Sequence, residues 1–130
     1  MSYQLVFGAS GYIGGHLVPY LAQHGAKVRA TARNVEVLQS REWQGVQLAE
    51  ADALKPETLD AVLEDVDTAF YLVHSMASGR DYASRDRQAA ESFRDAAATA
   101  GVPFVAYRNR TLLTQYHIES LKDLEELLEV

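Results

Sequence analysis

The 130-residue sequence contains no cysteine. This absence excludes disulfide bonds, thiolate metal sites and a cysteine nucleophile. Histidine is scarce as well, and its four positions show no spacing that would pair them with carboxylates as metal ligands: His16, His24, His74 and His117. We therefore predict no metal site.

Positive charge is also in short supply. The chain has 12 Lys and Arg residues against 18 Asp and Glu residues, which gives a formal net charge of −6. A nucleic-acid surface needs a clustered positive stripe, and since no long basic cluster occurs, we predict no nucleic-acid partner.

The first residues carry no charged leader and no apolar run long enough for a signal peptide or a membrane span. A cytoplasmic protein is the default expectation.

The sequence does contain a regular alternation of short apolar runs with segments of helical spacing. Apolar residues make up 48% and charged residues 23%, as is typical of one globular domain, here residues 1–130. Short apolar runs predict strands at residues 3–7, 27–32, 46–49, 68–73 and 103–107. Helical spacing predicts helices at residues 12–23 and 35–38, from Pro56 onward, at 81–100, and finally an amphipathic helix at 118–128.

This alternation predicts an α/β fold. Strands separated by helices pair in parallel through right-handed crossovers. We expect a doubly wound parallel sheet of the Rossmann type, with strand order 3-2-1-4-5 and helices on both faces. A ligand would then bind beyond the carboxyl ends of the first and fourth strands, where the strand order reverses.

The glycine-rich stretch "GASGYIGG" at residues 8–15 lies at that point. Gly8 would allow a tight turn out of the strand, Gly11 would leave room for a pyrophosphate, and Gly14 would let the helix pack closely on the sheet. The N–H groups of residues 10–13 open the helix, whose positive end favours an anion. A glycine-rich turn without a ligand is the alternative. A P-loop is excluded, since the chain has no Gly-Lys pair.

Two further residues follow strand ends. Arg33 comes directly after the second strand, where sites selective for NAD place a carboxylate, so its guanidinium favours the 2′-phosphate of NADP over NAD. The alternative is a solvated surface arginine. Asp52 follows the third strand, and its carboxylate would either accept a hydrogen bond from the adenine amine or cap the turn before Pro56. The sequence leaves both alternatives open.

Two segments of the chain are informative when they are taken together: "LVFGASGYIGGHLVPYLAQHGAKVRATAR" and "AEADALKPETLDAVLEDVDTAFYLVHSM". They resemble the atypical short-chain dehydrogenase/reductases, the NmrA-like and related NAD(P)-binding proteins. The resemblance covers about residues 3–103. It implies that NADP(H) binds to Ser10, Gly11, Tyr12, Ile13, Arg33, Asp52 and Ala53, with the backbone of Val73, His74 and Ser75 near the nicotinamide ribose. It also implies hydride transfer to a carbonyl, alkene or quinone-like substrate, although some members of the family only bind the cofactor.

The sequence departs from that family in its expected chemistry. Reductases of this type usually protonate the substrate with a tyrosine whose pKa is lowered by a lysine four residues later. None of the seven tyrosines here has a lysine at that position. His74 and Ser75 end the fourth strand near the expected crevice, where either could touch a substrate. No catalytic residue is assigned.

The tail, residues 104–130, matches nothing in the family. We expect a truncated chain or a grafted segment, with a natural minimal form as the alternative. The helix at 118–128 would either cover the sheet beside the fifth strand or, together with that edge strand, form a homodimer. Arginines and carboxylates that alternate along residues 80–95 are typical of a solvated helix face.

Two functions remain open at this point. The first is an NADP-dependent oxidoreductase, or the cofactor-binding part of one. The second is a non-catalytic NADP-binding module, such as a redox sensor, an interaction domain or an engineered minimal fold.

Overall fold

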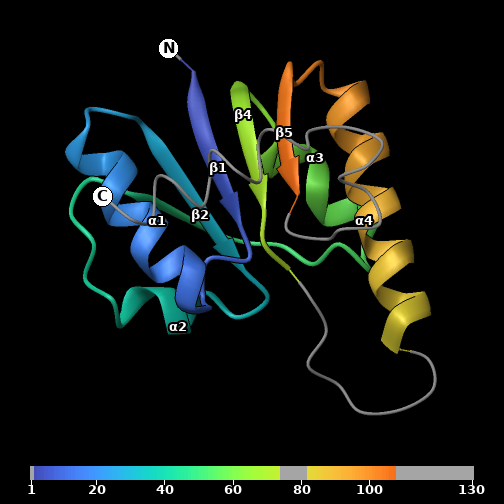
Figure 1. Ribbon diagram of the computed structural model, residues 1–130, viewed down its shortest axis with the longest axis horizontal. Coiled ribbons are helices and arrows are strands. Elements are labelled where there is room, and N and C mark those ends of the chain that lie inside the picture. The colour runs from blue at the N-terminus through green and yellow to red at the C-terminus, as the bar shows by residue number, and fades with distance from the viewer. Residues whose placement is uncertain (1, 74–81, 108–130) are drawn as a thin grey trace.

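The computed structural model describes residues 2–73 and 82–107, which form a single layered unit (Figure 1). Its core is a five-stranded parallel sheet with the strand order β3-β2-β1-β4-β5. The strands are β1 (Tyr3–Phe7), β2 (Val28–Ala32), β3 (Gln47–Glu50), β4 (Val66–Tyr71) and β5 (Phe104–Tyr107). The predicted Rossmann topology is therefore confirmed.

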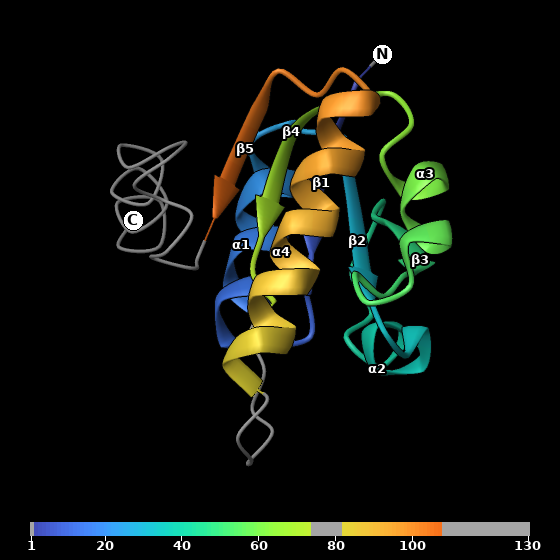
Figure 2. The same ribbon diagram turned by 90° about the vertical axis from the view of Figure 1, so that its right-hand side faces the viewer.

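Helices cover both faces of this sheet (Figures 1 and 2). They are α1 (Tyr12–Gln23), α2 (Val35–Gln39), a 3₁₀ turn η1 (Pro56–Thr58) that leads into α3 (Leu59–Val62), and α4 (Tyr82–Thr99). The predicted bounds of α1 and β1 agree with the structure residue for residue, and Pro56 occupies the first position of η1, as predicted. The predicted helix at 118–128 lies outside the described residues.

The two faces bury separate hydrophobic clusters. Leu17, Val18 and Leu21 of α1 pack with Leu38 of α2 on one face. On the other face, α3 and α4 pack over an aromatic group in which the rings of Phe7, Tyr71 and Phe93 have centroids 4.7–5.6 Å apart. Because both faces are covered, β2 is buried along its whole length and the last three residues of β1 and of β4 are buried, as expected of a parallel sheet.

β4 differs from its predicted position. The apolar run predicted a strand at 68–73, whereas the strand spans Val66–Tyr71. Pairing decides both ends: Val66 pairs with Tyr3 at the start of β1, and Tyr71 pairs with Phe7 at its end. Beyond that pair, Leu72 N–H donates a further hydrogen bond to Phe7 O at 2.9 Å.

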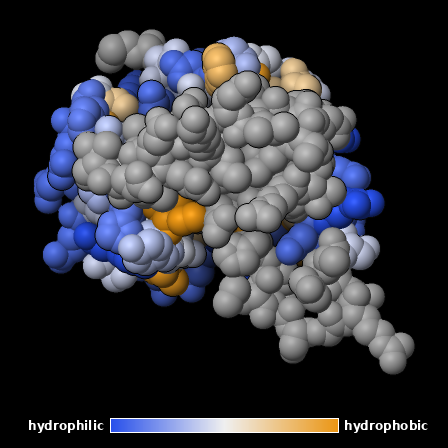
Figure 3. All heavy atoms as spheres, viewed as in Figure 1, coloured by the Kyte–Doolittle hydropathy of each residue, from blue (hydrophilic) through white to orange (hydrophobic). Residues whose placement is uncertain are grey.

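The described surface is mainly hydrophilic on the face shown in Figure 3, with a small group of hydrophobic residues near its middle. Large apolar side chains that are exposed are few among the described residues: Tyr12, Val37, Leu54 and Phe104. In the same part of the chain, no helix is both long and apolar enough to span a membrane.

Candidate functional site

A cavity of about 520 Å³ lies at the carboxyl ends of β1, β2, β3 and β4, where the strand order reverses. This is the volume range of ordinary small-molecule sites. Its lining combines strand ends, the β1–α1 loop and one wall of α4: Phe7, Gly8, Ser10, Gly11, Ala32, Arg33, Ala51, Asp52, Ala53, Leu54, Leu72, Val73, Arg85, Asp86 and Ala89. The position agrees with the crevice that the sequence predicted.

Gly8 makes the turn out of β1 in a backbone conformation that other residues rarely adopt. Its φ is +85°, and a Cβ at this position would lie 2.6 Å from Cγ2 of Val73 and 3.1 Å from its amide nitrogen. The N–H groups of Gly8 and Ala9 both donate to Thr31 O, at 3.1 and 2.8 Å. The fold itself therefore requires glycine at position 8.

Gly14 is also required by packing. It is buried in α1, and a Cβ there would lie 2.6 Å from both Cα and O of Ala9. The close approach that the sequence predicted for Gly14 is present, although the atoms that α1 approaches belong to the loop residue after β1. Neither the conformation at Gly8 nor the packing at Gly14 depends on a ligand.

Gly11 is different, because no described residue requires a glycine there. Its φ of −83° and ψ of −175° are ordinary extended values, and no atom of the described residues, its chain neighbours aside, lies within 4 Å of the position that a Cβ would take. Gly11 is the N-cap of α1 and has no side chain with which to cap this helix end. It lines the cavity, so the missing side chain leaves open space in front of an uncapped helix N-terminus.

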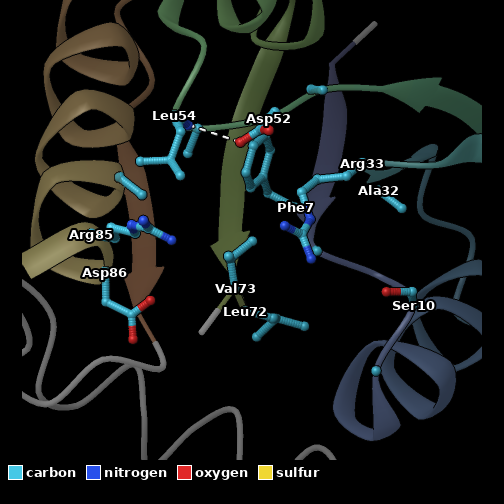
Figure 4. A pocket seen from close by; sticks show the side chains of 15 residues that line it. Phe7, Ser10, Ala32, Arg33, Asp52, Leu54, Leu72, Val73, Arg85 and Asp86 are labelled. Carbon is cyan, nitrogen blue, oxygen red and sulfur yellow. Dashed lines mark hydrogen bonds between the residues drawn. The ribbon is translucent and has the colours of Figure 1, made fainter. Parts of the chain in front are cut away.

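The residues around Gly11 divide into two groups. Ser10 lies at the cavity, as predicted (Figure 4). Tyr12 and Ile13 do not line it: Tyr12 is 80% exposed with its ring edge-on to His16 at 4.5 Å, and Ile13 packs against the core beneath α1. A role for these two residues in cofactor binding would have to come from their backbone.

Arg33 lies where the sequence placed it, directly after β2. Its side chain is exposed and lines the cavity, and in Figure 4 it extends from the end of β2 past the end of β1, with the guanidinium on the side of Val73. No carboxylate stands beside it at the end of β2, where the chain reads Thr31-Ala32-Arg33-Asn34. This end of the cavity therefore presents a cation.

Asp52 caps the turn after β3 and also lines the cavity. Its Oδ1 accepts a hydrogen bond from Leu54 N–H at 2.9 Å, which Figure 4 draws as a dashed line, and its own N–H donates to Thr58 Oγ1 at 3.0 Å. Of the two alternatives, turn capping is thus observed. The capped turn holds the buried Ala53 and the exposed Leu54 at the cavity wall.

At the end of β4, Val73 lines the cavity and closes it against Gly8. His74 and Ser75, which the resemblance placed near the nicotinamide ribose, lie outside the described residues.

One wall of the site was not predicted. Arg85 and Asp86 were grouped with the solvated face of their helix, yet both line the cavity together with Ala89. Figure 4 shows Arg85 extending from α4 toward the strand ends. Helical spacing alone could not show that this end of α4 rises beside the strand ends. Among described residues the lining thus carries two guanidinium and two carboxylate groups, and no cluster of three or more His, Asp or Glu side chains could hold a metal ion.

Arg41 is a second missed residue. It follows α2, is exposed, and donates from Nη2 to Ser10 O at 2.8 Å. No local pattern in the sequence links a residue after α2 to the β1–α1 loop, because the contact joins segments that are 31 residues apart.

Comparison with known proteins supports the same assignment of fold. A search of curated proteins found no match. The NADP(H) complex of triphenylmethane reductase from Citrobacter sp. is similar, with a TM-score of 0.69 and 22% identity, over 96% of this chain and 46% of that chain. The NADPH complex of the NADPH-dependent quinone oxidoreductase from Escherichia coli has a TM-score of 0.68 and 24% identity, over 95% and 45% of the two chains.

A short-chain dehydrogenase/reductase superfamily protein from Agrobacterium tumefaciens, with bound NAD, gives a TM-score of 0.67 at 20% identity, over 81% of this chain and 31% of that chain. At these identities the likeness establishes the fold, and this chain spans less than half the length of each of the three proteins. The model of the NmrA-like family matches residues 2–117, which extends past residue 103, where the resemblance was expected to end. With most of its residues matched and the fold confirmed, this chain belongs to the NmrA-like family.

Proposed function

We propose that this chain binds NADP(H) in the cavity at its strand ends and forms the cofactor-binding part of a reductase of the short-chain dehydrogenase/reductase type. The observation that carries this proposal is Gly11. Gly8 and Gly14 serve the fold, but Gly11 has ordinary dihedral angles and open space on its Cβ side. A diphosphate against the bare backbone accounts for a glycine that the protein itself does not need.

The charges of the site fit this ligand. The uncapped N-terminus of α1 offers N–H groups and a partial positive charge to the diphosphate. Arg33 offers a planar guanidinium to a 2′-phosphate, and no carboxylate at the end of β2 would repel it. These features favour NADP over NAD.

The remaining lining would hold the adenine and the nicotinamide. Ala53 and Leu54 form an apolar wall for the base, and a carboxylate oxygen of Asp52 would accept from its exocyclic amine. Val73, with the backbone of His74 and Ser75, would lie by the nicotinamide ribose. When bound, the nicotinamide supplies a hydride to a carbonyl, alkene or quinone-like substrate. The residues of this chain bind and orient the cofactor.

Titration with NADPH and NADH, followed by nicotinamide fluorescence, tests the proposal. We expect NADPH to bind more tightly, and Arg33→Ala to weaken NADPH binding by about tenfold, the effect of one charged hydrogen-bonded pair, while NADH binding stays unchanged. Arg87→Ala is the matched control, because Arg87 is an exposed arginine on α4 that does not line the cavity. Equal affinities of wild-type protein for the two cofactors would contradict the role of Arg33.

A non-catalytic NADP-binding module is the second candidate. The absence of a tyrosine followed four residues later by lysine favours it. Steady consumption of NADPH with a panel of carbonyl and quinone substrates would support the reductase, whereas binding without consumption would support the module. Homodimer formation through β5 or the C-terminal helix, and a cytoplasmic location, stay predictions.

A further inference from the structure

The fourth glycine of the loop, Gly15, has no part in the dinucleotide motif. It lies in the first turn of α1, and its φ is not positive. The nearest atom to a Cβ built at this position is Nη1 of Arg41, at 3.3 Å, which is tighter than ordinary van der Waals contact. The missing side chain of Gly15 therefore leaves room for a guanidinium that comes from another part of the chain.

Arg41 uses this room to reach the cavity loop. It follows α2, and its backbone N–H donates to Leu38 O at 3.1 Å. Its side chain passes Gly15 with Nη1 and donates from Nη2 to Ser10 O at 2.8 Å. One guanidinium thus connects the end of α2 to the loop residue that directly precedes Gly11.

This hydrogen bond constrains the peptide between Ser10 and Gly11. The described chain contains no cis peptide bond, so the carbonyl of Ser10 and the N–H of Gly11 point in opposite directions in one plane. A donor that holds the Ser10 carbonyl oxygen also fixes the direction of the Gly11 N–H. Without it, this exposed peptide would rotate more freely, because Gly11 has no side chain with which to cap the helix end.

We propose that Arg41 is a positioning residue for the dinucleotide site: it holds the Ser10 carbonyl so that the Gly11 N–H is directed toward the diphosphate, and the missing side chain of Gly15 leaves room for its guanidinium. This inference rests on the proposed function. It assigns Arg41 to the diphosphate region, which NADP and NAD share. Arg33, in contrast, discriminates between them.

The test compares the affinities of wild-type protein, Arg41→Ala, Arg41→Lys, Gly15→Ala and the double variant Gly15→Ala/Arg41→Ala. The probes are NADPH and NADH, followed by fluorescence, and adenosine 2′-phosphate, which lacks the diphosphate, followed by calorimetry. Arg87→Ala is the matched control for loss of an exposed arginine. Thermal unfolding of each variant checks that the fold is retained.

We expect Arg41→Ala to weaken NADPH and NADH binding by the same factor, about three- to tenfold as for one hydrogen bond, and to leave adenosine 2′-phosphate binding unchanged. Arg41→Lys keeps a donor and should restore part of the affinity. Gly15→Ala should give a smaller loss in the same direction, and it should add nothing to the loss caused by Arg41→Ala, because both act through one contact.

Three results would overturn the inference. Unchanged dinucleotide affinity in Arg41→Ala would show that the peptide needs no support. A loss confined to NADPH and adenosine 2′-phosphate would show that Arg41 contacts the 2′-phosphate itself. Additive losses in the double variant would separate Gly15 from Arg41. If wild-type protein binds neither dinucleotide, the proposed function fails, and this inference fails with it. That outcome is distinguishable from the three above because it is measured on the wild-type protein alone.

Discussion

Alanine at two glycines of the same loop should have opposite consequences for stability and binding. Gly11 and Gly14 are three residues apart at the start of α1. Within the described part of the chain, a Cβ on Gly11 meets no atom within 4 Å apart from those of its chain neighbours, whereas a Cβ on Gly14 lies 2.6 Å from the backbone of Ala9. If the open space at Gly11 is kept for a ligand, Gly11→Ala should damage binding and spare the fold, while Gly14→Ala should damage the fold first.

The structure sets the size of each effect on stability. Gly11 has extended dihedral angles that alanine adopts without strain, so the main loss is the poorer N-cap preference of alanine, about 0.5 kcal/mol. At Gly14 the neighbouring atoms are backbone and cannot rotate away, so overpacking should lower the free energy of unfolding by about 1–3 kcal/mol or more. At about 4 °C per kcal/mol for a domain of this size, the expected falls in Tm are about 2 °C and about 4–12 °C.

Binding gives the complementary measurement. We expect Gly11→Ala to weaken NADPH binding at least about tenfold, or about 1.4 kcal/mol, because the methyl group occupies space that the diphosphate needs. Thermal unfolding by circular dichroism and titration by nicotinamide fluorescence, on the same samples, supply both numbers. A folded Gly11→Ala protein with the affinity of wild type would refute the reasoning, since the diphosphate could not then lie against this residue.

Two further predictions concern buried polar groups. Thr31→Val should raise the free energy of unfolding by about 1 kcal/mol in urea denaturation, because Thr31 is fully buried and its Oγ1 has no hydrogen-bond partner among the described residues; a lower stability would contradict this. Arg29→Met should lower the free energy of unfolding by about 2 kcal/mol in the same assay, because the Arg29 guanidinium donates to Val62 O and Glu64 O, both at 2.7 Å. An unchanged free energy of unfolding would show that these carbonyls find other partners.

Much of the fold could be predicted because its determinants are local. The strand–helix alternation and the order of the strands follow from hydrophobic spacing and from the crossover rule. The limits of β4 did not follow. Asp67 precedes the apolar run at 68–73, yet Val66 and Asp67 belong to the strand because Val66 pairs with Tyr3 across the sheet. Pairing between distant segments outweighed local pattern at that point.

The residues of the site also fall into those that the sequence pattern predicts and those that it does not. Gly8, Ser10, Gly11, Arg33 and Asp52 follow strand ends, and parallel topology brings strand ends together, so their convergence at one cavity could be predicted. Arg85 lines the cavity from α4, and Arg41, which lies just beyond the end of α2, donates a hydrogen bond to the cavity residue Ser10. Their positions depend on where helix ends lie over the sheet, and spacing along a single helix carries no information about that.

The groups that bind and the groups that react separate in this chain. The cavity offers an uncapped helix end, a guanidinium for a phosphate and an apolar wall for a base, all of them features for holding a dinucleotide. Of the described residues that line it, none is a tyrosine or a lysine, and no tyrosine of the 130 residues has a lysine four positions later. The features of the cavity therefore bear on the binding of a cofactor, whereas the proton donor for any reduction is identified by measuring turnover. Binding of NADPH and turnover of NADPH are for this reason separate questions, and a folded variant such as Gly11→Ala addresses only the first.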